Sequence, residues 1–328
     1  MFYGSIDLGG TNIRCALGDA DGNLAAVDSA PTHSHEGPEA VLDRIAGLVD
    51  RLSRRSGIQA TAFGMGVPGL VDSARGVTRF LPNLPTQWRE VPVVRILEER
   101  LGVPVHILND VRTATLGELT FGWGREVSSF IFLAIGTGIG GGVVIDGKLR
   151  LGVMGAAGEM GHQTILPDGP ECGCGNRGCL EALANGPALS AAGVRLVRNG
   201  RAPILHSLIG GDLNLITPES MAQAAAAGEE SVRVEIRRAA DYIGIGIANV
   251  VTTLHPELVV LGGGVARIGD ILLEGVRETL YRRVGMFPPE TVRVEFSRMG
   301  DQAGILGGIA LAMQATRPGP GSTSGPAH

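Results

Sequence analysis

Residues 130–147 read FIFLAIGTGIGGGVVIDG, and this stretch decides the expected fold class. An apolar run over 130–135 leads into seven residues, 136–142, of which five are glycine. Val143, Val144 and Ile145 follow, and Asp146-Gly147 is a dipeptide that favours a tight hairpin turn. The pattern therefore predicts two antiparallel strands joined by a glycine-rich turn.

Two phosphate-binding motifs match this stretch by their letters alone. A Gly-x-Gly-x-x-Gly pattern falls at 136, 138 and 141, but a dinucleotide-binding fingerprint must open a helix within a βαβ unit. A partial P-loop, Gly142-x-x-x-x-Gly147-Lys148, is followed by Leu149, which has no hydroxyl for magnesium. Because β-branched residues follow the glycines at once, the sequence predicts a hairpin here and neither motif.

A second copy of the same design begins the chain. Residues 3–7 predict a strand, Asp7-Leu8-Gly9-Gly10-Thr11-Asn12 a turn, and residues 13–17 the return strand. Each hairpin begins a run of alternating strands and helices, which indicates a duplicated α/β fold. Such hairpins can offer backbone N–H groups to phosphate oxygens, and Asp7 adds a carboxylate suited to hydrated Mg²⁺. The alternative is that the glycines only make tight turns.

Hydrophobic periodicity places further elements between and after the hairpins. The expected helices are 38–52, 94–101, 112–121, 232–254 and 304–313, and the expected strands are 61–67, 105–108 and 258–261. The last strand opens into Gly262-Gly263-Gly264. Residues 317–328 are rich in Pro, Gly and Ser, which predicts a disordered tail.

Three of the four cysteines lie in one short stretch. Cys172, Cys174 and Cys179 follow His162, and together these four residues are the ligand set of a closed tetrahedral zinc site. Only one residue separates Cys172 from Cys174, which is too tight for an easy disulfide between them. A metal-free cluster of reduced cysteines on a loop is the alternative.

Glu159-x-x-His162, followed by Cys172-x-Cys174-Gly175-x-x-Gly178-Cys179-x-Glu181, resembles the ROK family of sugar kinases and sugar-responsive repressors. The resemblance runs from Asp7 to the helix over 304–313. It implies a two-lobed, actin-like (ribonuclease H-like) α/β sugar kinase fold with a zinc-binding loop. The implied smaller lobe comprises 1–112 and 302–316, and the larger lobe 113–301. In this family the histidine and cysteines bind structural zinc, and the two glutamates and the histidine line the sugar pocket.

The resemblance also assigns roles to the remaining candidate residues. Taken alone, Asp110 is most simply the N-cap of the helix that follows. The segment from Leu108 to Glu118 matches the catalytic segment of the family, which implies that Asp110 is the general base and that Asn109 binds a neighbouring hydroxyl. Pro82-Asn83-Leu84-Pro85 resembles a sugar-contacting loop. The implied nucleotide-binding residues are Asp7, Gly9, Gly10, Thr11, Asn12, Gly136, Thr137, Gly138, Gly140, Gly262, Gly263 and Gly264.

Composition narrows the expected partners and location. The chain has 328 residues and a net charge of −5, which offers no basic face for nucleic acid. No apolar run is long enough to cross a membrane, and Met1 leads directly into a strand pattern, so no signal peptide is expected. Cysteine use fits the reducing cytoplasm. Only six residues precede Asp7, so the DNA-binding domain of the repressor members is not expected.

The resulting expectation is an ATP-dependent hexose kinase that uses Mg²⁺, with glucose as the expected sugar and structural Zn²⁺ in the loop. An N-acetylmannosamine, N-acetylglucosamine or fructose kinase is the alternative among enzymes. A non-catalytic sugar sensor that acts through a protein partner is the alternative outside enzymes. The family implies a homodimer or a dimer of dimers. The motifs alone do not choose the hexose, because that choice depends on the shape of the pocket.

Overall fold

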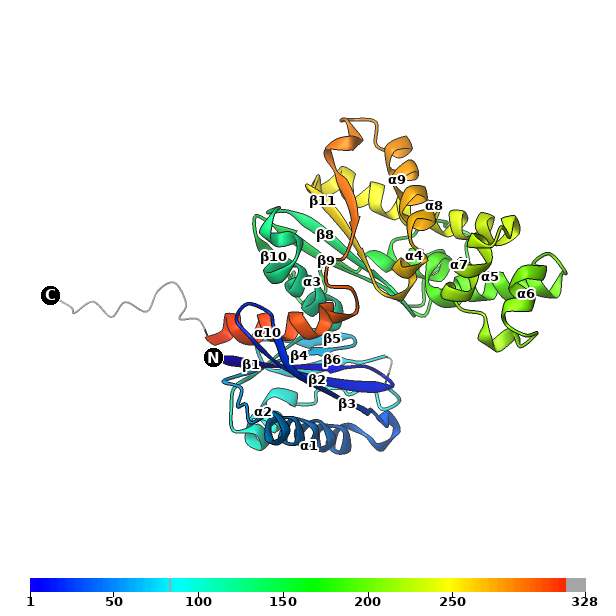
Figure 1. Cartoon of the computed structure of the whole chain (residues 1–328). Helices are drawn as coiled ribbons and strands as arrows, with labels where there is room; N and C mark the ends of the chain where they lie inside the picture. The colour runs from blue at the N-terminus through cyan, green and yellow to red at the C-terminus, as the bar shows by residue number, and fades with distance from the viewer. Residues whose placement is uncertain (83, 317–328) are drawn as a thin grey trace. The chain divides into compact units, whose positions relative to one another are not determined.

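The computed structural model describes residues 1–82 and 84–316 (Figure 1). Asn83 of the expected sugar loop and the expected tail over 317–328 lie outside these residues. By its internal contacts the chain divides into two compact units. Of the described residues, the first unit comprises Met1–Arg125, Leu151–Ala156 and 302–316, and the second comprises Glu126–Arg150 and Ala157–Asp301.

A five-stranded sheet with the order β3-β2-β1-β4-β7 forms the centre of the first unit. Strands β1, β2 and β3 are an antiparallel meander, and β4 and β7 run parallel to β1. The bounds are β1 Phe2–Leu8, β2 Asn12–Asp19, β3 Leu24–Pro31, β4 Phe63–Val67 and β7 Val105–Asn109. A separate antiparallel pair consists of β5 (Leu70–Asp72) and β6 (Val77–Phe80).

Helices cover both faces of this sheet (Figure 1). On one face lie α1 (Pro38–Ser56) and α2 (Val93–Leu101), and Leu42 and Ile45 of α1 join the same buried cluster as Ile6 of β1. On the other face lie α3 (Asp110–Phe121) and α10 (Ala303–Thr316), and Ile309 of α10 packs with Tyr3 of β1. Because helices pack on both faces of the sheet, the strand ends that carry the candidate residues Asp7 and Asn109 are fixed in position.

The second unit repeats this sheet. Its strands have the order β10-β9-β8-β11-β12, in which β8, β9 and β10 are antiparallel and β11 and β12 run parallel to β8. The bounds are β8 Phe130–Ile135, β9 Ile139–Ile145, β10 Lys148–Arg150, β11 Leu258–Gly262 and β12 Arg293–Phe296. The same order in both sheets confirms the predicted duplication.

The predicted hairpin over 130–147 is also confirmed. Phe130 pairs with Val144 and Ile135 with Ile139, so the turn is shorter than predicted. The return strand begins at Ile139 and not at Val143, because Gly140, Gly141 and Gly142 pair with β8 as strand residues. Asp146 and Gly147 have φ angles of 53° and 69°, the left-handed pair that a two-residue hairpin turn of type I′ requires.

Most of the helices of the second unit were not predicted. Only α8 (Glu230–Leu254) has the long apolar period that the sequence displays clearly. The others are α4 Leu180–Ala184, α5 Gly186–Arg198, α6 Pro203–Leu208, α7 Pro218–Ala226 and α9 Asp270–Arg283. The strands β3, β5, β6, β10 and β12 were not predicted either, and all but β3 are only three or four residues long.

Glycines allow α3 and α10 to cross at short range in the first unit. A Cβ at position 307 would lie 1.8 Å from the Thr113 carbonyl oxygen, and one at position 117 would lie 2.7 Å from the Ala303 carbonyl oxygen. This packing places α3 in the first unit, which extends to Arg125, whereas the sequence placed the boundary after residue 112. The helix that begins with Asp110 is therefore held directly against the first sheet.

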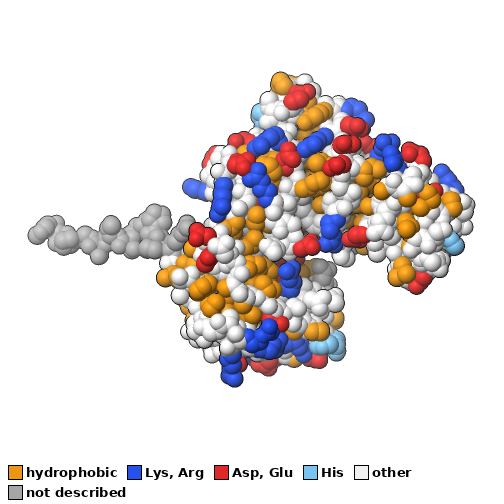
Figure 2. Space-filling model, viewed as in Figure 1, with side chains coloured by type: hydrophobic (Ala, Val, Ile, Leu, Met, Phe, Trp, Pro, Cys, Tyr) orange, Lys and Arg blue, Asp and Glu red, His pale blue; other side chains and the backbone are white. Residues whose placement is uncertain are grey.

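Charged side chains of both signs alternate over the face shown in Figure 2. Among the described residues, many charged side chains form ion pairs, such as Arg79 with Asp72 at 2.7 Å and Arg238 with Glu235 at 2.6 Å. Within residues 1–82 and 84–316, none of the helices combines the length and apolar composition that a membrane crossing requires.

Candidate active site and metal centre

Asn109 and Asp110 lie where β7 ends and α3 begins. Asn109 is the N-cap of α3, because its side-chain oxygen accepts hydrogen bonds from the backbone N–H groups of Val111 (3.0 Å) and Arg112 (3.2 Å). Asp110 is the first helical residue, and its carboxylate accepts the N–H of Val111 at 2.8 Å. The capping role that Asp110 would have in isolation thus belongs to Asn109.

The Asn109 side chain is held in one orientation. Its Nδ2 donates to the carbonyl of Gly69 at 3.1 Å, and its Oδ1 also accepts from Nη1 of Arg112 at 3.0 Å. Arg112 is only 2% exposed, so this contact is shielded from water. Since the amide carries two N–H donors, the one not directed at Gly69 is the group that could meet a ligand hydroxyl.

Two carboxylates share the carboxyl edge of the first sheet. Asp7 lies on β1 and Asp110 follows β7, on either side of Gly66 in β4. The pKa of Asp110 is raised to about 6, chiefly by burial and also by the negative charge of Asp7, while the Val111 N–H and the Arg112 guanidinium oppose the shift. Burial also raises the pKa of Asp7, against the opposing effect of Arg14. A carboxylate poised near neutral pH is suited to accept a proton from a hydroxyl group.

The carbonyl groups of the first glycine turn are bound by one buried residue. Thr32 donates from its hydroxyl to the Gly9 carbonyl at 2.7 Å and from its backbone N–H to the Thr11 carbonyl at 2.7 Å. The turn itself is closed by the bond from the Gly9 N–H to the Asn12 carbonyl at 2.9 Å. Thr32 is fully buried, so these two bonds are shielded from water.

The second glycine turn, at 136–139, lies beside the third glycine segment. Strand β11 pairs with β8 as far as Gly262 opposite Ala134, which brings residues 262–264 next to the turn. Gly263 has a φ of 81°, and a Cβ there would lie 2.4 Å from the Ile135 carbonyl oxygen. The structure therefore brings these two predicted nucleotide segments together within the second unit.

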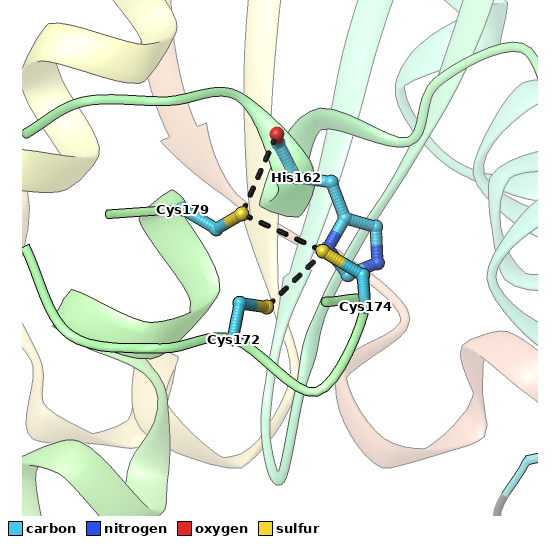
Figure 3. Close-up of side chains that lie close together, drawn as sticks. All are labelled: His162, Cys172, Cys174 and Cys179. Carbon is cyan, nitrogen blue, oxygen red and sulfur yellow. Dashed lines mark hydrogen bonds between the residues drawn. The ribbon is translucent and has the colours of Figure 1, made fainter. Parts of the chain in front are cut away.

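The four predicted metal ligands converge on one point (Figure 3). His162 ends a short 3-10 helix, Met160–His162, and Cys179 immediately precedes α4. The ligand atoms of His162, Cys172, Cys174 and Cys179 all lie within 4.8 Å of one another. Sγ of Cys174 is 3.7 Å from Sγ of Cys179, and Sγ of Cys172 is 3.7 Å from Nδ1 of His162.

These distances fit one tetrahedral zinc ion. Thiolates that bind the same zinc at about 2.3 Å lie about 3.8 Å apart, close to the observed separations. The pKa of Cys179 is raised to about 12, chiefly by burial and also by its thiol neighbours Cys174 and Cys172. A bound cation would reverse this effect, because it stabilises thiolates.

Both candidate sugar-binding acids contact this cluster. Oε2 of Glu159 is 3.8 Å from Nε2 of His162, so the two ring nitrogens of His162 face different partners. The Cys172 thiol donates to Oε1 of Glu181 at 3.7 Å, and Oε2 of Glu181 accepts the N–H of Ile139 at 2.8 Å. A metal bound here would hold the loop that carries both acids.

The structure thus forms two groups of predicted residues. The first unit contains Asp7, Asn109 and Asp110, and the second contains Glu159, His162 and Glu181 with the second and third glycine segments. Sequence analysis missed the residues that hold these groups, namely Thr32, Arg112 and Asn185, whose Nδ2 donates to the Thr137 carbonyl at 2.8 Å. Of these, only Asn185 carried a signal, because Asn185-Gly186-Pro187 is a typical helix start.

Comparisons with known proteins agree with this architecture. A model of the ROK family matches residues 3–315. The glucokinase of Streptomyces coelicolor is 35% identical over 94% of this chain and 96% of its own length. The xylose repressor of Caldicellulosiruptor bescii is 34% identical over 94% of this chain and 77% of its own length.

Among solved structures, a ROK family glucokinase from Streptomyces griseus in complex with glucose and AMPPNP matches with a TM-score of 0.85. The two chains are 32% identical, and the match covers 96% of this chain and 100% of the glucokinase. This similarity confirms the predicted actin-like α/β sugar kinase fold. Because the family model matches nearly the whole chain and these relatives exceed 30% identity, the chain belongs to the ROK family.

Proposed function

We propose that the protein is an ATP-dependent hexose kinase that converts glucose to glucose 6-phosphate. The observation that carries the proposal is Asp110, a carboxylate at the end of β7 whose pKa is raised to about 6. The similarity to the Streptomyces glucokinases, one of them bound to glucose and AMPPNP, supports glucose and ATP as substrates.

In this proposal Asp110 accepts the proton of the sugar hydroxyl that attacks the γ-phosphate of ATP. The new bond forms between that hydroxyl oxygen and phosphorus, and the bond from phosphorus to the bridging oxygen of ADP breaks. Asn109 positions a neighbouring hydroxyl with its remaining amide N–H. Glu159, His162 and Glu181 bind further hydroxyls of the sugar, as does Asn83.

The nucleotide would bind along the three glycine segments. Asp7 would hold hydrated Mg²⁺, which neutralises the charge that develops on the phosphates. Backbone N–H groups of the turns at 9–12 and 136–140 would contact phosphate oxygens. Gly262, Gly263 and Gly264 would lie on the adenosine side. Phosphoryl transfer depends chiefly on such positioning and charge neutralisation.

The four-residue cluster would hold a structural Zn²⁺. Its donor set of three cysteines and one histidine is that of closed structural zinc sites. In this role the metal takes no part in the transfer. It would fix the loop from which Glu159 and Glu181 project, and His162 would present its second nitrogen on the side of Glu159.

Two further features are proposed from the family resemblance. The protein would act as a homodimer or a dimer of dimers, which light scattering on the purified chain would test. It would reside in the cytoplasm, where the four cysteines, all of them free thiols in the structure, remain reduced.

A second candidate function is sugar sensing without catalysis. It is favoured by the similarity to the xylose repressor of Caldicellulosiruptor bescii over 94% of this chain. Within enzymes, the N-acetylmannosamine kinase of Citrobacter koseri, which is 31% identical, keeps an N-acetylated hexosamine as an alternative substrate.

One assay separates these candidates. ADP release is measured with Mg·ATP and, in turn, glucose, fructose, N-acetylmannosamine, N-acetylglucosamine and xylose, with a sugar-free control. We expect the highest kcat/KM with glucose. A higher value with another sugar would overturn glucose as the substrate. Sugar binding by calorimetry with no ADP release for any sugar would overturn the kinase and favour the sensor.

A further inference from the structure

The glycine turn at 136–139 is held from one side by the junction between α4 and α5. The backbone N–H of Gly186 donates to the Gly136 carbonyl at 2.8 Å. The side-chain Nδ2 of Asn185 donates to the Thr137 carbonyl, also at 2.8 Å. These two bonds fix the orientation of two successive peptide groups of the turn.

The orientation of a carbonyl determines that of the N–H in the same peptide group. In a trans peptide the C=O and the N–H point in opposite directions, and the described chain has no cis peptide bond. Because the carbonyls of Gly136 and Thr137 point toward the helix junction, the N–H groups of Thr137 and Gly138 point away from it. Successive N–H groups on one side of a turn form a concave site for an anion.

The first unit contains an independent version of this arrangement. Thr32 binds the carbonyls of Gly9 and Thr11 in the first glycine turn, both at 2.7 Å. By the same geometry, the N–H groups of Gly10 and Asn12 point away from Thr32. A side chain that holds the turn carbonyls therefore occurs in both halves of the duplicated fold, although the two side chains differ and come from different elements.

We propose that Asn185 is a positioning residue for the nucleotide phosphates. Its amide keeps the Thr137 carbonyl turned inward, so that the N–H group of Gly138 faces the phosphate oxygens before the nucleotide arrives. The backbone N–H of Gly186 does the same for the N–H group of Thr137 through the Gly136 carbonyl. This inference rests on the proposed function, because it takes the turn at 136–140 as a phosphate-binding element. Asn185 itself does not touch the nucleotide.

Asn185 also has a structural role that the test must separate. Its Oδ1 accepts the N–H of Ala188 at 2.8 Å and so caps α5. Serine caps helices about as well as asparagine. The serine side chain is shorter by one bond, and its single hydroxyl cannot both accept from Ala188 and reach the Thr137 carbonyl. Asn185→Ser therefore keeps the cap and removes the bond to the turn, whereas Asn185→Ala removes both.

The experiment is calorimetric binding of Mg·AMPPNP without sugar, followed by steady-state kinetics and thermal melting. For Asn185→Ser we expect affinity for AMPPNP to fall by about two- to ten-fold, the value of one hydrogen bond, and the KM for ATP to rise to match. The KM for glucose and the melting temperature should stay at the wild-type values. Asn185→Ala should show the same loss of affinity and a lower melting temperature. Asn199→Ser, an exposed position at the other end of α5, is the matched control.

Wild-type affinity for AMPPNP in Asn185→Ser, together with a lower melting temperature in Asn185→Ala, would show that Asn185 is only a cap and would overturn the proposal. Failure of the proposed function is distinguishable from this result. In that case the wild type binds AMPPNP but transfers phosphate to none of the sugars, and the comparison of affinities still decides the role of Asn185.

Discussion

The buried carboxylate of Asp110 is expected to be necessary for catalysis and, at the same time, to lower the stability of the protein. Asp110→Asn keeps the size of the side chain and leaves the cap of α3 intact, since Asn109 supplies that cap. We expect kcat to fall by about 10²–10⁴, the usual contribution of a general base. The melting temperature at pH 7.5 should be equal to or above that of the wild type, because the variant no longer buries a carboxylate.

Turnover, melting and AMPPNP affinity should be measured on one preparation of Asp110→Asn. Normal melting with a wild-type rate of sugar phosphorylation would show that Asp110 is not the base. A loss of both folding and nucleotide binding would point to a structural role.

Glu159 and Glu181 contact different groups, so their substitutions should have different effects on the KM values for glucose and ATP. Glu181 accepts the N–H of Ile139 beside the second glycine turn, whereas the neighbour of Glu159 is His162. We expect Glu159→Gln to raise the KM for glucose at least ten-fold with the KM for ATP nearly unchanged. Glu181→Ala should raise both constants, since the turn loses a contact as well. Equal effects of Glu159→Gln on both substrates would contradict its assignment to the sugar.

At the scale of elements, the loop over 159–181 should depend on its metal. Mass spectrometry of the elements in fresh protein should find about one zinc per chain. Cys172→Ser should lower zinc content, melting temperature and activity together, because metal binding and folding of such loops are linked. Cys15→Ala is the control, since Cys15 is buried in β2 away from the cluster and its loss should leave the zinc content unchanged. Full activity in protein without metal would refute the site.

The crossing of α3 and α10 is a second element on which the site depends. A Cβ at position 307 would lie 1.8 Å from the backbone of Thr113, so Gly307→Ala should force α3 to shift. We expect a loss of about 1–3 kcal/mol in the free energy of unfolding. Activity should fall as well, since α3 begins with Asp110.

The matched control for Gly307→Ala is Gly47→Ala, in the interior of α1. A Cβ there would meet nothing within 4 Å, so helix propensity alone predicts stabilisation by up to about 1 kcal/mol. Chemical denaturation of both variants gives the comparison. Equal stabilities of the two variants would mean that the crossing tolerates a side chain.

For the whole molecule, the sequence predicted the duplicated α/β fold but not which helices pack against each other within each unit. The glycine hairpins carry strong local signals, and both are present, although residues 139–142 of the second belong to its return strand and not to the turn. The placement of α3 in the first unit depends on its contact with α10, nearly 200 residues away in the chain. Periodicity reports which residues are buried and not what they pack against. The metal cluster was predictable because its four ligands are chemically distinctive. Thr32 and Arg112 were not, because a buried threonine and arginine leave no pattern.

The free energy of unfolding of the whole protein should depend on pH through the titration of Asp110. Its pKa rises from the ordinary 3.8 to about 6 on folding, so the folded state binds a proton more tightly than the unfolded state. The favourable contribution of this group is therefore fully present below about pH 4 and is lost as pH rises through about 6. Asp110→Asn does not titrate.

The free energy of unfolding of the wild type, minus that of Asp110→Asn, should thus fall by at most about 3 kcal/mol between pH 4 and pH 7.5. Acids that do not interact with Asp110 are present in both proteins and largely cancel in the difference, whereas Asp7, whose charge acts on Asp110, contributes to it. Urea denaturation of both proteins at several pH values measures it. A difference that is constant with pH would mean that the Asp110 carboxylate is as well solvated in the folded protein as in the unfolded chain, and the acid limb of kcat/KM should then lie near pH 4 instead of near pH 6.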